Sequence, residues 1–286
     1  MPKEVRYEAP GNLVEVNGHS MHVFYTGQGK DTFVFLSGAG TSCPTLDFKP
    51  LWSLLANDNR IAVVERAGYG WSEVTNTSRD IDIVLNETRE SLKLSKIEAP
   101  YILVPHSASG LEAIYWAQKY PSEIEAIIGL DSAIPAIYDN FKIPPALVID
   151  IVGFLVKIGI HKPFTKMVCK KTPAVLSGYL AEDDIEAFIE RYKQRLFTTN
   201  MICETKFIRR NADKVKNGAT PSNIPIFVFI SNGNEKVIAN WSKKISDYVS
   251  TFSNGKCMLL DCGHYVHAHE PQKISKEIND FISYIV

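Results

Sequence analysis

The chain has 286 residues, of which 45% are hydrophobic and 22% charged, a composition typical of a globular protein large enough for one α/β domain with an insertion. Because 31 basic residues stand against 32 acidic ones, the formal net charge is -1, and no basic field is available to attract nucleic acid. The five cysteines are scattered without a Cys-x-x-Cys pair, which argues against structural zinc and favours a reducing compartment.

The N-terminal part of the chain is predicted to form a β-hairpin. The first residues, MPKEVRYEAPGN, contain no apolar segment that would direct secretion, so we expect a cytoplasmic protein. The segments NLVEVNG and HSMHVFYTG come next, and Asn17-Gly18 between them is a strong signal for a two-residue hairpin turn.

Beyond the hairpin, short apolar runs alternate with helical patterns. The runs are continuous, as expected for parallel strands buried on both faces, and they cover 32–38, 60–68, 101–107 and 124–132. The helical patterns that separate them cover roughly 46–56, 79–95 and 108–119. This alternation predicts an α/β fold in which a mostly parallel, doubly wound sheet carries helices on both faces.

The alternation stops near residue 133 and resumes near residue 222. Residues 133–221 show helical patterns and no convincing strand, whereas IPIFVFIS and KCMLLDCG again read as strands, each followed by a helix. We interpret the chain as an α/β core, formed by residues 1–132 and 222–286, that is interrupted by a helical lid at 133–221.

The longest apolar stretch, ALVIDIVGFLVKIGI at 146–160, lies within this predicted lid. It is too short to span a bilayer and contains Asp150 and Lys157, so we expect no membrane span. Its apolar side chains fit either the wall of an acyl-binding pocket or an ordinary helix packed on the core. The residues concerned are Ile149, Val152, Phe154, Leu155 and Ile158.

Reactive side chains follow the predicted strands at their carboxyl ends, where ligands gather in sheets of this type. Ser107, several acidic residues and His264 stand at the ends of different strands, in the chain order serine, acid, histidine. The acidic residues are Glu65, Asp131, Glu235 and Asp261. A serine hydroxyl becomes a nucleophile when a histidine takes its proton, and a carboxylate is needed to orient that histidine. The strand ends therefore supply this set, with more than one candidate for the acid.

In the order and spacing of its motifs, the chain resembles the lidded serine hydrolases of the α/β-hydrolase superfamily over essentially all of residues 10–286. VFLSGAGTS resembles the oxyanion loop, RAGYGWS the glycine-rich turn after the fourth strand, PHSASGL the nucleophile elbow and CGHYVHAHEP the catalytic-histidine loop. The resemblance implies an α/β-hydrolase fold without a cofactor, with Ser107 as the nucleophile and His264 as its base.

The predicted elbow departs from the G-x-S-x-G pattern on both sides of the serine. Pro105 and Ser109 stand where small glycines are usual, because strand and helix approach closely around a strained serine backbone. Both residues are compact, proline suits an extended strand end, and Gly110 supplies room one position later. We therefore prefer Ser107 as a nucleophile over a simple helix N-cap.

The candidate base has two histidine neighbours. His264, His267 and His269 have H-x-x-H-x-H spacing, yet no acidic or cysteine cluster completes a metal site, so no metal is expected. His264 is preferred because it follows the end of a predicted strand, where the family's base lies. His106, beside the serine, is expected to point away from the nucleophile and to pack.

The acid that orients His264 has two candidates. The family most often places it after the strand read here as IPIFVFIS, where this chain has Asn234 and then Glu235. Some members, including haloalkane dehalogenases and certain lipases, place it after the preceding strand, which here ends at Asp131. We favour Asp131 and keep Glu235 as the alternative.

The backbone N–H groups of Ala39 and Ala108 are the expected oxyanion hole, since two such donors stabilise the charge that develops in acyl transfer. Many relatives have His-Gly where this chain has Ser37-Gly38, but backbone donors do not depend on that side chain. The turn from Arg66 to Ser72 is interpreted as structural, its glycines serving tight backbone conformations.

A serine nucleophile argues against dehalogenases and epoxide hydrolases, which need a carboxylate at this position. The first hypothesis is a carboxylesterase-like serine hydrolase that acts on a small acyl substrate through an acyl-enzyme. The enzymatic alternatives are an acyltransferase and a proline-iminopeptidase-like aminopeptidase, in which Asp183, Asp184 and Glu186 would hold the substrate's amine. The non-enzymatic alternative is a binding protein that keeps the pocket without turnover.

Overall fold

The structure, a computed structural model, describes residues 7–139, 141 and 143–285. Its centre is an eight-stranded sheet with the order β1-β2-β4-β3-β5-β6-β7-β8. β1 and β2 pair antiparallel, β2 pairs antiparallel with β4, and the remaining neighbours pair in parallel. The strands are β1 (Asn12–Val16), β2 (His19–Thr26), β3 (Thr32–Leu36), β4 (Arg60–Glu65), β5 (Tyr101–Pro105), β6 (Ile124–Leu130), β7 (Ile226–Ser231) and β8 (Gly255–Leu260).

The predicted fold class is confirmed, and so is the hairpin. Asn17 and Gly18 have φ values of 53° and 77°, the left-handed conformation that a two-residue hairpin turn requires at both positions. Each predicted strand is present, because continuous apolar runs of this length suit strands that are covered on both faces.

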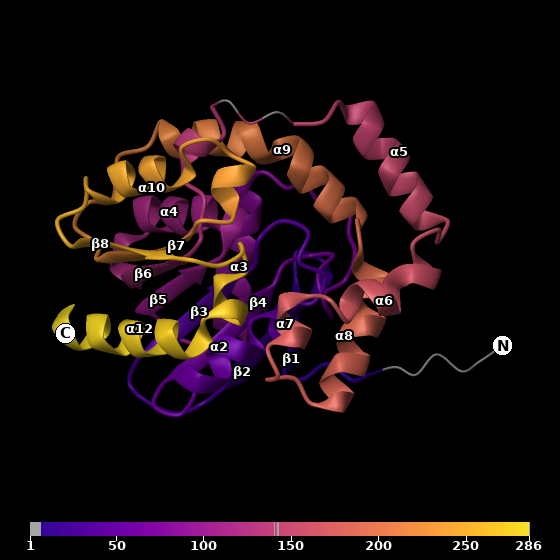
Figure 1. Cartoon of the computed structure of the whole chain (residues 1–286), viewed down its shortest axis with the longest axis horizontal. Helices are drawn as coiled ribbons and strands as arrows, with labels where there is room; N and C mark the ends of the chain where they lie inside the picture. The colour runs from indigo at the N-terminus through magenta and orange to yellow at the C-terminus, as the bar shows by residue number, and fades with distance from the viewer. Residues whose placement is uncertain (1–6, 140, 142, 286) are drawn as a thin grey trace.

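Helices cover both faces of the sheet, as Figure 1 shows. In β3, Phe33 and Phe35 belong to the apolar cluster that includes residues of α2 and α12, whereas Val34 and Leu36 point to the opposite face and belong to the cluster that includes residues of α3, α4 and α10. These helices are α1 (Pro44–Asp47), α2 (Lys49–Leu55), α3 (Ile81–Leu94), α4 (Gly110–Lys119), α10 (Trp241–Val249) and α12 (Pro271–Ile285), with the short α11 (Val266–His269) before the last.

A helical segment lies between β6 and β7. Figure 1 shows most of it at the right of the view, outside the sheet, with α9 running back over the core. Asn211 of α9 makes this contact, since its amide accepts from Ile81 N at 3.1 Å and donates to Arg79 O at 3.0 Å. The helices are α5 (Ala146–Lys157), α6 (Thr165–Cys169), α7 (Pro173–Leu176), α8 (Glu182–Arg195) and α9 (Thr199–Lys216). Within the described residues, no helix combines the length and the apolar character needed to cross a membrane.

Candidate active site

Ser107 occupies a sharp turn between β5 and the short 3-10 turn Ser107–Ser109 that leads into α4. Its φ is 54°, a left-handed value that is strained for any residue other than glycine. The turn is held on two sides: Ala133 N donates to Ser107 O at 2.8 Å, and a Cβ added to Gly38 would lie 2.8 Å from Ser107 Cβ. Close packing of neighbouring loops therefore keeps the serine in its strained conformation.

Ser109, one of the two departures from the glycine pattern, is buried and hydrogen-bonded. Its Oγ accepts from His106 N at 2.9 Å and lies 2.7 Å from Leu36 O of β3, to which it donates. The close approach falls one residue later, since a Cβ added to Gly110 would lie 2.1 Å from Ala133 O. The serine thus ties the elbow to the adjacent strand, and Gly110 provides the room.

Asp131 follows β6 and is fully buried beside His264. His264 Nδ1 donates to Asp131 Oδ2 at 2.6 Å, an arrangement that fixes the tautomer and leaves Nε2 free. Ser231 donates to the same carboxylate through N at 2.9 Å and Oγ at 2.6 Å, and Trp241 Nε1 donates at 2.7 Å. With φ at 48°, Asp131 is itself strained, and this ring of donors holds it in place.

Asn234 occupies the position where the family most often has its acid. Its Nδ2 donates to Asp131 Oδ2 at 2.9 Å and lies 2.7 Å from His264 Nδ1. Because His264 Nδ1 carries the hydrogen given to Asp131, both residues act as donors to one carboxylate oxygen. The amide therefore supports the acid that stands on the neighbouring strand.

Glu235, the alternative acid, points elsewhere. It is exposed and accepts from both N and Oγ of Ser242, each at 3.0 Å. The backbone hydrogen bond from Ser242 is the main reason why the pKa of Glu235 lies below its ordinary value. Of the two candidates, the structure brings Asp131 to His264 and leaves Glu235 away from it.

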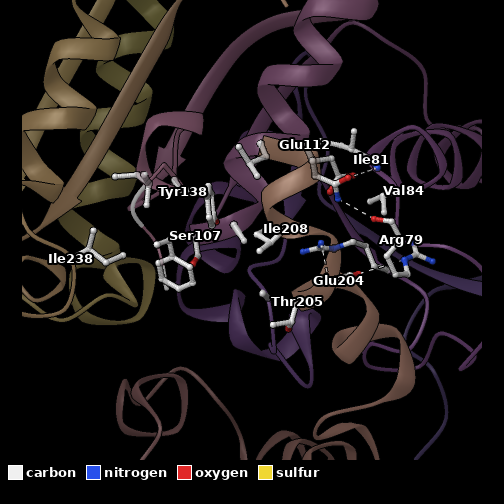
Figure 2. Close-up of a pocket in the computed structure, with 18 of the residues that line it drawn as sticks. Arg79, Ile81, Val84, Ser107, Glu112, Tyr138, Glu204, Thr205, Ile208 and Ile238 are labelled. Atoms are coloured by element: carbon white, nitrogen blue, oxygen red, sulfur yellow. Dashed lines mark hydrogen bonds and ion pairs between the residues drawn. The ribbon is translucent and has the colours of Figure 1, made fainter. Parts of the chain in front are cut away.

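Ser107 and His264 line one cavity of about 330 Å³, together with Ala39 and Ala108. Within the described residues, Ser107 Oγ makes no hydrogen bond to a protein atom. Figure 2 shows the serine beside Tyr138, with Ile208 further along the cavity. Most of the remaining lining is apolar: Ile81, Val84, Leu111, Ile137, Tyr138, Phe141, Ile208 and Ile238.

Charged residues that the sequence reading missed line the other end of this cavity. In Figure 2, Glu112, Arg79 and Glu204 lie on the far side of Ile208 from Ser107. All three charged residues are buried, and Glu204 Oε2 pairs with Arg66 Nη1 at 3.1 Å. The carboxylate of Glu112 within the apolar run GLEAIYWA was a local signal, but its charged neighbours come from three other segments of the chain.

The two ends of this charged group keep free hydrogen-bonding atoms. Arg79 donates from Nη2 to Glu87 at 2.5 Å, whereas its Nη1 has no protein partner within the described residues. Glu112 Oε1 lies 2.6 Å from Thr88 Oγ1, and its Oε2 likewise has no partner there. Burial raises the pKa of Glu112 by more than the nearby Arg66 charge lowers it.

The turn that contains Arg66 has its predicted structural role and a further one. Gly68 and Gly70 have φ values of 82° and 45°, and a Cβ at Gly70 would lie 2.0 Å from the Glu65 carboxylate. The Arg66 guanidinium also donates to Ser37 O and so anchors the loop that precedes Ala39. Arg66 also lines the cavity, so this turn contributes to the site as well as to the fold.

The other histidines take separate partners. His106 is buried, with its ring 4.9 Å from that of His267, and its Nε2 lies 3.3 Å from His264 O. Burial, with smaller contributions from His264 and His267, holds the pKa of His106 well below its ordinary value. His267 Nε2 instead pairs with Asp47 at 3.1 Å. No group of His, Cys, Asp or Glu in the described part of the chain is arranged to hold a metal ion.

The apolar residues of α5 do not form the wall of the cavity, and only Ile149 among them is buried. Val152 and Leu155 are exposed, as are Phe154 and Ile158, which have exposed fractions of 61% and 58%. Both predictions are therefore wrong for these four residues: they do not line the cavity, and they do not pack against the core. The reason is that α9 lies between α5 and the core and supplies the lining residues itself.

The acidic residues considered for an amine-binding site also lie away from the cavity. Asp184 Oδ2 lies 2.5 Å from Lys49 Nζ, and Glu186 Oε2 accepts from Tyr7 OH at 2.7 Å. Neither these residues nor Asp183 line the cavity that contains Ser107. The amine-binding cluster suggested for an aminopeptidase is therefore absent from the described site.

Solved structures share this architecture over almost the whole chain. An epoxide hydrolase from Vigna radiata matches with a TM-score of 0.72 at 17% identity, covering 96% of this chain and 97% of that one. The chain therefore has the α/β-hydrolase fold. Cfl2 from Burkholderia cenocepacia is another α/β-hydrolase-fold match, with a TM-score of 0.70 at 17% identity over 94% of each chain.

Sequence comparison shows that this chain belongs to one family with the uncharacterized protein YbdG of Bacillus subtilis (strain 168). The two are 35% identical over 278 residues, which is 95% of this chain and 85% of YbdG. A second uncharacterized B. subtilis protein, YqjL, is 31% identical over 120 residues, or 42% of this chain and 47% of YqjL. No protein-family model matches the chain.

The buried Glu112 predicts a pH dependence of stability. Because its pKa in the folded protein is raised above the ordinary 4.5, its contribution to stability is fully present below pH 4.5 and is lost as the pH rises through the folded-state pKa. Glutamine binds no proton, so Glu112→Gln should remove this loss. As the pH rises from below 4.5, we expect the free energy of unfolding of the variant to increase relative to that of the wild type, measured by urea denaturation from pH 4 to 8.

Glu90 of α3, whose side chain is half-exposed, provides the control. Glu90→Gln should leave the pH profile of the free energy of unfolding parallel to that of the wild type. A Glu112→Gln profile that also runs parallel to the wild type would contradict the raised pKa.

Proposed function

We propose that this α/β-hydrolase cleaves a small carboxylic ester through an acyl-enzyme, with Ser107, His264 and Asp131 as its triad. The observation that carries the proposal is the meeting, at one cavity, of a strained and unpaired serine with a histidine held by a buried carboxylate. Nucleophile, base and orienting acid are the three parts that acyl transfer by a hydroxyl group needs.

The reaction begins when Ser107 Oγ attacks the ester carbonyl carbon and its proton passes to His264 Nε2. His264 then gives this proton to the alcohol oxygen as the carbon–oxygen bond breaks, which leaves an acyl-serine. A water molecule attacks the acyl carbon, again with His264 as base, and the returned proton restores the serine hydroxyl as the carboxylic acid leaves. Asp131 stabilises the imidazolium that forms in each half of the reaction.

The negative oxygen of each tetrahedral intermediate would be bound by the backbone N–H groups of Ala39 and Ala108. Both residues line the cavity beside Ser107, and Ala108 lies in the first turn of a helical segment, where N–H groups lack intrahelical partners. The contact between Gly38 and Ser107 holds the two loops together, so the donors are positioned before substrate arrives.

Epoxide hydrolysis, named for several structural neighbours, does not fit a serine at this position. A carboxylate that opens an epoxide forms an ester, which water can hydrolyse. A serine hydroxyl would instead form an ether, which has no carbonyl carbon for water to attack. Ser107 therefore favours acyl substrates.

The size and lining of the cavity favour short acyl chains. Its apolar part lies next to Ser107, but a long alkyl chain would reach Arg79 and Glu112 and cover their free polar atoms without offering a hydrogen bond. The catalytic efficiency is accordingly expected to fall for acyl chains that extend past Ile208.

A fluorophosphonate probe tests the nucleophile directly. We expect rapid labelling of the wild type and none of Ser107→Ala, because the probe reacts with an activated serine. Ser253→Ala, at an exposed serine outside the cavity, should label like the wild type. A wild type that labels no faster than Ser107→Ala would favour the catalytically silent binding protein over the enzyme.

Paired substitutions test the acid. Asp131→Asn should reduce the turnover of p-nitrophenyl butyrate by about 10³–10⁴-fold, since an amide favours the wrong histidine tautomer. Glu235→Gln, its control, should change turnover by less than about threefold, because it leaves His264 and its partner intact. The reverse ranking would assign the role to Glu235.

A series of p-nitrophenyl esters from acetate to decanoate tests the cavity. We expect kcat/KM to be highest for the short acyl chains, and Glu112→Leu to move the optimum towards longer ones, because leucine removes the free carboxyl group. Circular dichroism of the variant checks that it is folded. An efficiency that rises steadily to decanoate in the wild type would contradict the short-chain preference.

A further inference from the structure

Helix α5 turns an apolar stripe towards solvent. Leu147, Ile151, Phe154, Leu155 and Ile158 recur at the spacing i, i+4, i+7, i+8 and i+11, which places them on one side of the helix. Their exposed fractions are 71%, 50%, 61%, 40% and 58%. A surface helix ordinarily packs such a stripe against the core of the protein. In α5 the stripe has no such apolar contact.

The other side of α5 is already occupied by α9. Ile149 is buried there, and a Cβ added to Gly153 would lie 2.3 Å from Ile202 Cδ1 of α9. Asp150 Oδ1 pairs with Lys206 Nζ of α9 at 2.6 Å. Figure 1 shows α5 at the outer edge of the molecule, with α9 on its inner side. The exposed stripe therefore faces away from α9, and at its border Phe154 lines a groove together with residues of α8 and α9.

The apolar surface continues beyond α5 and is accompanied by positive charge. Residues 151–181 contain five lysines and neither aspartate nor glutamate, in a chain whose net charge is -1. All five lysines are exposed, and none forms an ion pair with a residue that the structure describes. They are Lys157, Lys162, Lys166, Lys170 and Lys171. Exposed apolar residues lie between and beside them: Ile160, Phe164, Met167 and Val168.

We propose that this surface, which we call the α5–α6 face, docks onto a membrane that contains anionic lipids. It consists of the stripe of α5, the four apolar residues after it and the five lysines. Apolar side chains of an interfacial helix enter the boundary between headgroups and acyl chains, while lysines reach anionic headgroups and lay their stems along the apolar surface. Both kinds of side chain are exposed on this segment, and the lysines form no ion pair with any described residue.

The geometry of α5 favours a position in the membrane surface rather than across it. Its 12 residues extend about 18 Å at about 1.5 Å per residue, well short of a hydrocarbon core of about 30 Å. The lysines at and after its C-terminal end would lie level with the headgroups when the stripe is immersed.

A second copy of the chain fits this face less well. A two-fold contact through the α5–α6 face would bring five unpaired lysines of one copy towards five of the other, with no carboxylate in 151–181 to compensate. An anionic lipid surface supplies the missing negative charge and the apolar phase together.

Sedimentation of the full chain with large unilamellar vesicles tests the proposal. Because this assay measures binding and not the hydrolysis of a substrate, its result does not depend on the proposed esterase activity. We expect the wild type to bind vesicles of phosphatidylcholine with about 30 mol% phosphatidylserine, and to bind phosphatidylcholine alone at least about tenfold more weakly. High salt should release it, because lysine–headgroup attraction is screened.

Two variants separate the charges from the apolar stripe. The first carries Lys166→Gln, Lys170→Gln and Lys171→Gln, and the second Ile151→Ser, Phe154→Ser and Ile158→Ser. Each should bind the anionic vesicles at least about tenfold more weakly than the wild type, because interfacial binding needs both contributions. All six positions are exposed, so the thermal unfolding midpoint should stay close to that of the wild type.

Matched controls change exposed residues outside this face. Lys30→Gln, Lys236→Gln and Lys273→Gln remove the same charge, and Leu13→Ser, Val237→Ser and Leu259→Ser remove apolar surface of similar exposure. Both controls should bind like the wild type. Failure of the wild type to bind, or equal weakening in the controls, would overturn the proposal. So would a stable dimer in sedimentation velocity that the Ile151, Phe154 and Ile158 variant converts to monomer.

Discussion

The Asp131 carboxylate is the point at which the separate parts of this site are joined. It stands buried after β6 and accepts hydrogen bonds from Ser231 at the end of β7, Trp241 at the start of α10, Asn234 between them and His264 after β8. Burying a carboxylate costs free energy unless hydrogen bonds satisfy it, so the fold brings these donors together around Asp131. The orientation of His264 follows from that requirement.

The same constraint explains how the site accommodates an amide at position 234, where α/β-hydrolases most often have a carboxylate. A carboxylate at position 234 would lie against the Asp131 carboxylate, and like charges at that distance repel. Asparagine instead adds a donor to the acid on the neighbouring strand. The strain at Ser107 and Asp131 is maintained in a similar way, because Gly38 and the residues around Ala133 leave their backbones little room to relax.

The helical segment between β6 and β7 has two sides with different chemistry. On the inner side, α9 contributes Ile208 and Glu204 to the cavity, so one helix supplies both apolar lining and part of the charged end. On the outer side, α5 presents exposed apolar residues beside unpaired lysines. The proposed substrate selection and the proposed membrane attachment can therefore change independently, because α9 separates the two sides.

The fold class, the hairpin at Asn17-Gly18 and the positions of the strands follow from the sequence alone, because hydrophobic periodicity and turn chemistry are local properties. The sequence also placed Ser107 and His264 at strand ends. The sequence favoured Asp131 over Glu235, but only the tertiary structure shows that Asp131 contacts His264 and Glu235 does not, since that contact depends on where two strands and a loop meet. The tertiary structure likewise brings Arg66, Arg79, Glu112 and Glu204 together from four separate segments.

For α5, the sequence determined that an apolar stripe exists. The packing of α9 against the opposite side decided that the stripe faces outwards, because a helical pattern specifies a face and not what covers it.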